Sequence, residues 1–416
     1  MRTQSFRNRT LTLGQASRAT YFWALWASTA AANLADGIFK LALPLLATRF
    51  TDSPAQVAGV AFAVRLPWLL FALLAGVLAD RFDRRRMMLG ANLGRSLVLL
   101  LLVTLSLLDG LSLALLYLIA LVLGIAETLA DTAGASILPS IVGTDGLERA
   151  NARLVGVTTV TNEFIGPPLG GVLAAAGIAL AFATSSALYL AAALAVVLIG
   201  GSYRVLLSSN GQRLLLLHDM ASGLCYVWND RLLRALVIIV AVMNLGWSAW
   251  MSIMVLYVVS PGPGGLSEFG YGVMLTSIGI GGLAGTLTAV AFVRRFGRRW
   301  AIGADILGTF IMLITPALTA NAWAIGAVAV IGGLGGAIWS IVVSSIRQQA
   351  VPDELQGRTS GVFRLFGFGA LPLGSVLAGL TAEVFGIPAV FALCAGLTCI
   401  LLVPFARDIV PALPKE

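Results

Sequence analysis

The most informative stretch of this chain is Gly76-Val77-Leu78-Ala79-Asp80-Arg81-Phe82-Asp83-Arg84-Arg85-Arg86. It places acids and a run of arginines between two long apolar segments. Charged side chains are costly in the hydrocarbon core of a bilayer, so such a run marks a turn where two membrane spans meet on one side. We interpret the stretch as a charged hinge between two spans.

The composition of the whole chain is that of an integral membrane protein. Its 416 residues are 58% hydrophobic and 11% charged, and the mean hydropathy is +0.93, which is far more apolar than a soluble domain. A spanning helix takes about 20 apolar residues, which leaves room for about twelve. We expect the spans at 20–48, 55–79, 87–108, 111–138, 153–177, 179–203, 232–259, 270–293, 300–319, 322–346, 359–382 and 387–406.

The basic residues follow alternate connections between these spans. Most of the 27 Lys and Arg residues cluster before the first span and after each even-numbered one. Asp109, Glu268 and Glu383 mark the opposite side, where Arg49, beside Asp52, is the exception. Because basic loops stay in the cytoplasm, we expect a multi-pass protein of a bacterial-type inner membrane with both termini cytoplasmic. This distribution explains the net charge of +8 without nucleic acid, so no nucleic-acid partner is expected.

Cysteine and histidine are too sparse for a metal site or a redox centre. Cys225, Cys394 and Cys399 are scattered, and His218, the one histidine, falls in the polar stretch after the sixth span. The sequence also lacks a constellation of nucleophile, base and metal ligands. The polar N-terminal region is too long for a cleavable signal peptide. We therefore expect no cofactor, no metal and no enzymatic activity.

The chain contains an internal repeat. Arg81–Arg85 after the second span reappears as Arg295–Arg299 after the eighth, and Pro168–Ala174 is echoed by Pro372–Ala378. Both pairs are about half a chain apart and keep the same orientation in the membrane, which is typical of a parallel repeat. We predict an N-terminal six-helix bundle at 1–203, a C-terminal one at 232–416, and between them a cytoplasmic linker at 204–231 with an amphipathic helix.

The charged hinge resembles the loop signature between the second and third helices of the major facilitator superfamily. The resemblance implies an all-α membrane fold of twelve spans in two bundles. It also implies that Gly76, Asp80, Arg81 and Arg84 are gating residues that hold the cytoplasmic side closed in the outward-facing state. Asp131 on the fourth span is the expected partner of Arg84. In the alternative interpretation the arginines only anchor the topology.

The fifth span contains Gly166-Pro167-Pro168-Leu169-Gly170-Gly171, which resembles the final part of the antiporter signature of drug exporters. Glycines allow close helix approach and prolines bend a helix. Gly166, Pro167, Gly170 and Gly171 are therefore predicted packing residues of an antiporter. The upstream glycines of the signature are absent, so a helix kink without an antiporter role is the alternative.

Charged residues inside spans are functional candidates by default. Those of this chain are Asp36, Lys40, Arg65, Arg95, Glu127, Asp131, Glu163 and Asp305. We predict Asp36, Glu127, Glu163 and Arg95 as the proton-coupling residues, since burial favours a protonated acid unless a cation pairs with it. Lys40, four residues from Asp36 on one helix face, either neutralises Asp36 or reaches the membrane surface. The arginine usual on the fourth span of proton antiporters is absent, and Arg95 is the nearest substitute.

Three residues are candidates for a substrate cavity. Asn33 shares the helix face of Asp36, and Trp250 and Trp339 fall near span centres. Ligand cavities are mostly apolar with a few polar groups. Interface belts and lipid-facing packing are the alternative for the aromatic residues.

Further segments narrow the resemblance. Leu138–Val142, Glu148–Asn151 and Val351–Glu354 resemble the branch of drug:proton antiporters that holds macrolide-efflux proteins and the enterobactin exporter. The resemblance implies a monomer that works in a lipid bilayer and exports a hydrophobic or amphipathic small-molecule substrate by alternating access, driven by protons. Two alternatives stay open: a lipid or lysolipid flippase, and a non-transporting membrane sensor or scaffold.

Overall fold

The computed structural model describes residues 15–143, 146–204 and 212–413, which are almost entirely helical. Eleven helical segments in these ranges are long and apolar enough to cross a membrane. They are α1 (Gln15–Ala47), α2 (Pro54–Arg81), α3 (Arg84–Leu107), α4 (Leu113–Val142), α7 (Ile178–Val197), α9 (Arg231–Val258), α10 (Glu268–Phe296), α11 (Arg298–Leu318), α12 (Ala322–Ala350), α13 (Asp353–Phe385) and the run of α14 (Ile387–Ile400), α15 (Leu402–Pro404), η2 (Phe405–Ile409) and α16 (Val410–Ala412).

The one remaining crossing, the fifth along the chain, is a composite helix. It consists of α5 (Leu147–Thr159), the π-helical turn η1 (Val160–Ile165) and α6 (Gly166–Ala176). Pro167 and Pro168 stand in the first turn of α6. Proline lacks an N–H and its ring clashes with the carbonyl four residues earlier, so the backbone widens just before the pair. The predicted all-α fold of twelve spans is thereby confirmed.

Short polar residues set where several helices begin. Ser53, Ser112, Asp230, Ser267 and Asn321 each precede a helix and accept a hydrogen bond from a backbone N–H of its first turn. Such caps satisfy donors that have no partner within the helix. The long apolar runs therefore end at polar residues near the membrane surface.

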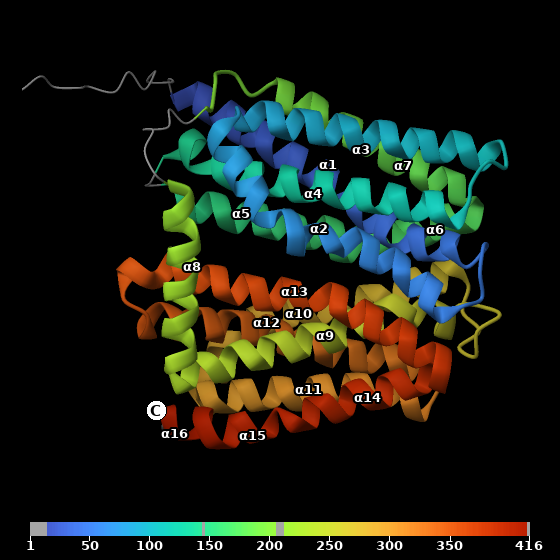
Figure 1. Cartoon of the computed structure of the whole chain (residues 1–416). Helices are drawn as coiled ribbons and strands as arrows, with labels where there is room; N and C mark the ends of the chain where they lie inside the picture. Colours follow the sequence, from blue (N-terminus) through green and yellow to red (C-terminus); the bar gives the residue numbers. More distant parts are fainter. Residues whose placement is uncertain (1–14, 144–145, 205–211, 414–416) are drawn as a thin grey trace, which may run out of the picture.

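The spans form two groups (Figure 1). In one, α1 and α3 pack on α7 and α2 packs on α4; in the other, α9 packs on α13 and α11 packs on α12 and α14. The helix α8 (Gln212–Asn229) runs across one end of the spans. We call this the α8 end and the opposite one the Glu268 end. Our interpretation of this packing keeps the boundaries of 1–203, 204–231 and 232–416.

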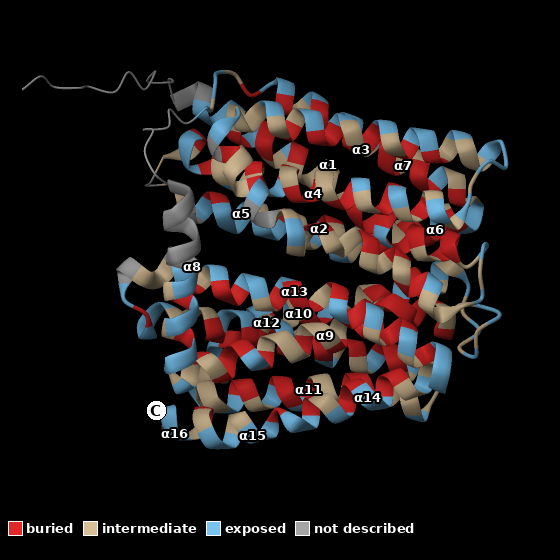
Figure 2. Cartoon of the chain, in the orientation of Figure 1, coloured by how far each residue is buried: buried red, intermediate tan, exposed pale blue. Residues whose placement is uncertain are grey.

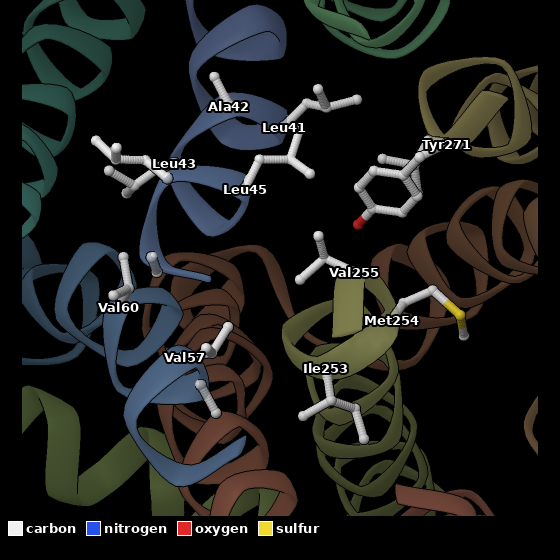
Figure 3. Packing of buried hydrophobic residues seen from close by; sticks show 14 of the residues in the cluster. Leu41, Ala42, Leu43, Leu45, Val57, Val60, Ile253, Met254, Val255 and Tyr271 are labelled. Atoms are coloured by element: carbon white, nitrogen blue, oxygen red, sulfur yellow. The ribbon is translucent and has the colours of Figure 1, made fainter. Parts of the chain in front are cut away.

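Among the described residues, the buried apolar cluster that contains side chains of both groups lies at one end of the spans (Figures 2 and 3). The largest cluster contains Leu45 of α1 and Val57 of α2 together with Val255 of α9 and Tyr271 of α10, near the Glu268 end. Two further clusters lie closer to the α8 end, one built from residues 22–199 and the other from residues 227–409. The two groups are therefore packed together near the Glu268 end, and each has its own core near the α8 end.

Candidate transport site

A cavity of about 690 Å³ extends from the middle of the spans towards the α8 end. Most of its walls come from α9 to α13, and Thr159 and Glu163 of the composite helix close one side. Trp247, Trp339 and Phe363 supply aromatic surface. A space of this size with apolar walls and few polar groups is typical of a small-molecule site.

Two of the three predicted cavity residues are not part of the described cavity lining. Trp339 lines the cavity, but Trp250 is fully buried and stacks on Trp247 at a centroid distance of 6.2 Å. Trp247, three residues earlier on α9, lines the cavity instead. Asn33 lies outside the described lining; it donates to the Thr29 carbonyl and accepts from Asn162 at 3.4 Å.

Two acids line this cavity, one from each group of spans. Glu163 belongs to the π-helical turn η1, and Asp305 belongs to α11. The Asp305 residue is 2% exposed. Sequence reasoning recorded Asp305 as a charge within a span but assigned it no role. It is the one acid inside the expected spans of the C-terminal half, and this was the available signal.

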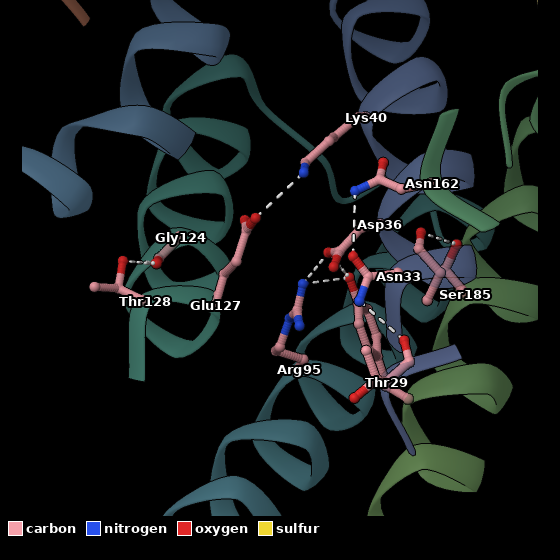
Figure 4. Close-up of polar contacts among 12 residues, drawn as sticks. Thr29, Asn33, Asp36, Lys40, Arg95, Gly124, Glu127, Thr128, Asn162 and Ser185 are labelled. Carbon is pink, nitrogen blue, oxygen red and sulfur yellow. Dashed lines mark hydrogen bonds and ion pairs between the residues drawn. The ribbon is translucent and has the colours of Figure 1, made fainter. Parts of the chain in front are cut away.

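Asp36 lies in a buried polar cluster on α1 (Figure 4). It forms an ion pair with Arg95 of α3 and accepts a hydrogen bond of 2.6 Å from the Tyr189 hydroxyl on α7. Arg95 also donates to Tyr189 and its guanidinium lies 3.9 Å from the centre of the tyrosine ring. Asp36 and Arg95, which were predicted separately as proton-coupling residues, therefore contact each other, and Tyr189 joins them as a member that the sequence did not indicate.

Lys40 does not neutralise Asp36, which corrects one of the two alternatives. Its Nζ lies 3.2 Å from Glu127 Oε1 on α4 (Figure 4). Lys40 lies one turn beyond Asp36, and Arg95 reaches Asp36 from α3. Glu127 thus has a cation beside it. Its side chain is 11% exposed and that of Lys40 is 40% exposed.

Arg65 connects the two groups of spans near mid-membrane. Its Nη1 atom donates to Ser248 at 2.7 Å and to Ser252 and Ser375 at 3.2 Å. These serines belong to α9 and α13, whereas Arg65 belongs to α2. Sequence reasoning noted the charge of Arg65 and missed its partners, because serines in apolar spans carry no distinctive pattern.

The charged hinge ties neighbouring helix ends together at the α8 end. Asp83 caps α3 and accepts hydrogen bonds of 2.8 Å from the Ser202 hydroxyl and 2.9 Å from the Tyr203 N–H. Arg85 donates to the carbonyls of Val196 and Val197 at the end of α7. The loop between α2 and α3 is therefore anchored to the segment that follows α7.

The predicted gating residues occupy the same region. Arg84 donates to the Ala79 carbonyl and, at 2.7 Å, to the Ser136 carbonyl on α4. The Asp80 side chain lies outside the described residues. The remaining three, Gly76, Arg81 and Asp131, lie on the last turns of α2 and on α4. Their gating roles and the expected pairing of Arg84 with Asp131 stay predictions.

The glycines of the fifth-span motif are sites of close helix approach. A Cβ atom at Gly166 would lie 2.6 Å from the Gly37 Cα on α1, and one at Gly170 would lie 3.1 Å from the Ile38 Cα. A Cβ at Gly171 would lie 2.6 Å from the Glu268 carbonyl oxygen of α10. The Pro167 carbonyl faces Gly272 of α10 in the same way. The motif therefore packs α6 both within its own group and across to the other.

No cluster of three or more potential metal ligands occurs in the ranges that the structure describes.

The sequence matches a family model described as "Transmembrane secretion effector" over residues 15–415. The multidrug efflux pump Tap of Mycolicibacterium fortuitum is 28% identical over 380 residues, covering 86% of this chain and 88% of the pump. Tap of Mycobacterium tuberculosis (strain ATCC 25618 / H37Rv) is 28% identical over 425 residues, covering 94% of this chain and 95% of the pump.

Solved structures show the same fold. A mutant of the nucleoside transporter NupG superposes with a TM-score of 0.76 at 14% identity, covering 94% of this chain and all of that one (100%). A bacterial homologue of the iron transporter ferroportin gives 0.72 at 17% identity, covering 94% and 98%. A bacterial homologue of the lysosomal transporter Spinster gives 0.73 at 14% identity, covering 97% and 100%.

Proposed function

Because this chain belongs to the transmembrane secretion effectors, a family of major facilitator transporters, we propose that it exports a hydrophobic or amphipathic small molecule in exchange for protons. The family consists of multi-pass membrane transporters and not of enzymes. The Tap relatives are multidrug efflux pumps, which favours a drug or a secreted metabolite as substrate.

The observation that carries this proposal is the cavity together with its one-sided closure. The aromatic and glycine-rich walls surround about 690 Å³ between mid-membrane and the α8 end. The Arg65 hydrogen bonds and the core cluster that includes Val57 and Val255 join the two groups beyond it, towards the Glu268 end. A central site sealed on one side is what alternating access between two repeats requires.

In this proposal the α8 end faces the cytoplasm. The basic residues of the hinge and of the α10–α11 turn lie at that end, which supports the positive-inside orientation. The cavity is then ready to receive substrate from inside the cell. The protein works as a monomer in the inner membrane, with both termini in the cytoplasm.

The proposed proton pathway uses the acids that face cations or the cavity. Asp36 with Arg95, and Glu127 with Lys40, form two ion pairs on neighbouring helices of one group. Protonation of either acid releases its cation, so the two states of the transporter need not hold the same number of protons. Glu163 sits at the boundary between this group and the cavity. Each proton that enters contributes about 2.3 kcal/mol per 100 mV of membrane potential.

We propose that the charged hinge stabilises the opposite state of the transporter, in which the α8 end is closed and the Glu268 end is open. Gly76, Asp80, Arg81, Arg84 and Asp131 would hold the α8 end closed when the Glu268 end opens. A charge cluster that is complete in only one state favours that state.

Purified protein in proteoliposomes tests the export proposal. We expect an imposed proton gradient, acidic on the side of the Glu268 end, to drive ethidium out of the compartment that faces the α8 end. A protonophore should abolish the flux. Movement of a labelled lysolipid without ethidium transport would identify a flippase instead. No flux of either probe would favour a sensor or scaffold.

A further inference from the structure

We infer that Asp305 is the charge-recognition residue of the cavity, and that the site takes an organic cation with one positive charge and apolar substituents. The inference rests on the proposed export function and deepens it. It concerns which molecules the cavity prefers, whereas the proposed function concerns whether flux is coupled to protons.

The first argument is that Asp305 has no partner of its own. Its residue is 2% exposed and lines the cavity from α11. Within the described ranges, no side chain or backbone group donates a hydrogen bond to it and no cation pairs with it. A buried carboxylate needs either a proton or a counter-cation. At Asp305 a ligand in the cavity can provide that cation.

The other buried acids show the contrast. Asp36 has Arg95 and Tyr189, and Glu127 has Lys40. These acids are satisfied by the protein itself. Asp305 is therefore suited to a ligand, whereas the two ion pairs are suited to a change of protonation within their own group of spans.

The second argument is the charge and chemistry of the rest of the lining. The other ionisable groups that line the cavity are Glu163 from η1, Arg347 from α12 and Arg364 from α13. The lining parts of α9 and α10 contribute no ionisable side chain. The helix α14 also packs against α11, and its ionisable side chain Cys394 is buried and is not part of the described cavity lining. Asp305 lies beside Gly335 in the middle of α12, whereas Arg347 lies in the last turn of that helix, at the α8 end. The acid therefore stands deeper in the cavity than Arg347.

Aromatic walls complete the match to a cation. Trp247, Trp339 and Phe363 line the same cavity. The faces of aromatic rings attract cations, and apolar substituents of a ligand gain from burial against them. A delocalised organic cation satisfies both the carboxylate and the aromatic surface.

Gly335 of α12 lies beside the Asp305 carboxylate, and the adjacent Gly336 lies at the cavity wall. A Cβ at Gly335 would lie 2.5 Å from Asp305 Oδ1, whereas a Cβ at Gly336 would meet no atom within 4 Å. Both glycines belong to α12, and Gly336 lines the cavity. Gly335→Ala should therefore displace the Asp305 carboxylate. Gly396→Ala on α14 is its matched control, because a Cβ there would also meet no atom within 4 Å and Gly396 is not part of the described cavity lining.

The test compares a cation with an uncharged molecule of similar shape. Binding of tetraphenylphosphonium and of triphenylphosphine oxide to the purified full chain is measured by calorimetry. We expect Asp305→Asn to weaken tetraphenylphosphonium binding about tenfold to a hundredfold, the range of a charge-assisted contact, and to leave triphenylphosphine oxide binding unchanged. Asp109→Asn, which removes the same charge in the α3–α4 loop, should affect neither.

The two glycine variants decide the matter if Asp305→Asn does not fold. Gly335→Ala should then weaken binding of the cation alone, and Gly396→Ala should not. Equal losses for both molecules, or wild-type cation affinity in Asp305→Asn, would overturn the inference. So would a wild-type protein that binds the two molecules equally. A protein that shows the expected cation preference without gradient-driven flux would leave this inference standing and refute the export proposal.

Discussion

The Nη1 atom of Arg65 on α2 lies 3.2 Å from the hydroxyl oxygen of Ser375 on α13, on the other side of the interface between the two groups of spans. Ser375 also contacts the hydroxyls of Ser248 at 3.1 Å and Ser252 at 2.8 Å. These hydroxyls give the arginine acceptors where no bulk water is present. The arrangement needs the two groups to be in contact, so it stabilises the state that is closed at the Glu268 end.

We predict that Arg65→Met shifts the protein away from this closed state. The variant loses three hydrogen bonds from a charged donor, each worth about 1.5–3 kcal/mol at most. Spin labels at Asp52 and Val384, both exposed at the Glu268 end, should report a longer distance in the variant. Arg49→Met, in the neighbouring loop, is the control. Identical distance distributions in wild type and Arg65→Met would show that the contact does not hold the state.

Asp36→Asn should abolish proton-driven efflux. It should also destabilise the protein, because removing one member of a buried ion pair costs about 3–5 kcal/mol. The double variant Asp36→Asn with Arg95→Met removes both charges and should recover much of the thermal stability without recovering coupling. Stability and proton flux are measured on the same preparations. Wild-type coupling in Asp36→Asn would move the predicted proton site to Glu127 and Glu163.

Gly171→Ala should loosen the contact between α6 and α10. Its Cβ would lie 2.6 Å from the Glu268 carbonyl oxygen, so the helices must separate. We expect faster hydrogen–deuterium exchange in the first turns of α10. Gly156→Ala on α5 is the matched control, since a Cβ there meets no atom within 4 Å. Unchanged exchange in Gly171→Ala would mean that α10 absorbs the methyl group without moving.

Asp83→Ala should lower thermal stability at neutral pH by about 1 kcal/mol, the usual contribution of a helix N-cap. Partial burial raises the pKa of Asp83, but hydrogen bonds from the Tyr203 N–H, the Ser202 hydroxyl and the Arg86 N–H outweigh it and hold the pKa below its ordinary value. A lowered folded-state pKa stabilises the protein above the unfolded-state pKa and ceases to do so as pH falls through the folded-state pKa.

The stability difference between wild type and Asp83→Ala should therefore be constant above about pH 5 and shrink at more acidic pH. Thermal unfolding across this range measures it. Asp52→Ala, in the exposed α1–α2 loop, provides the comparison. A difference that grows on acidification would contradict the assigned hydrogen bonds.

The topology is tested by labelling in intact cells. With Cys225, Cys394 and Cys399 replaced, a cysteine at Asp109 should react with a membrane-impermeant thiol reagent. A cysteine at Arg204, exposed at the α8 end, should react only after permeabilisation. The reverse pattern would place the α8 end outside the cell.

Much of the fold follows from local properties of the sequence. Long apolar runs must become helices in a bilayer because every backbone N–H and C=O needs a partner within the segment. The twelve spans were therefore predictable, including the composite fifth one. Its interruption at Val160–Ile165 was less so, since Pro167 and Pro168 predict a bend without specifying a π-helical turn.

The partners of the membrane charges were decided by the tertiary structure. Four-residue spacing along α1 allowed a pair between Lys40 and Asp36, yet Lys40 contacts Glu127 and Asp36 contacts Arg95. The same holds for Asp305, whose role depends on a cavity wall that α9, α10, α12 and α13 build together with Thr159 and Glu163. The sequence alone determined which segments cross the membrane and which ends carry charge. The free energy of burying an unpaired backbone group or a charge in the bilayer depends on the segment itself and not on its neighbours. Only the packing of helices distant in sequence determined which side chains meet, because that depends on the rotation and spacing of each helix against its neighbours.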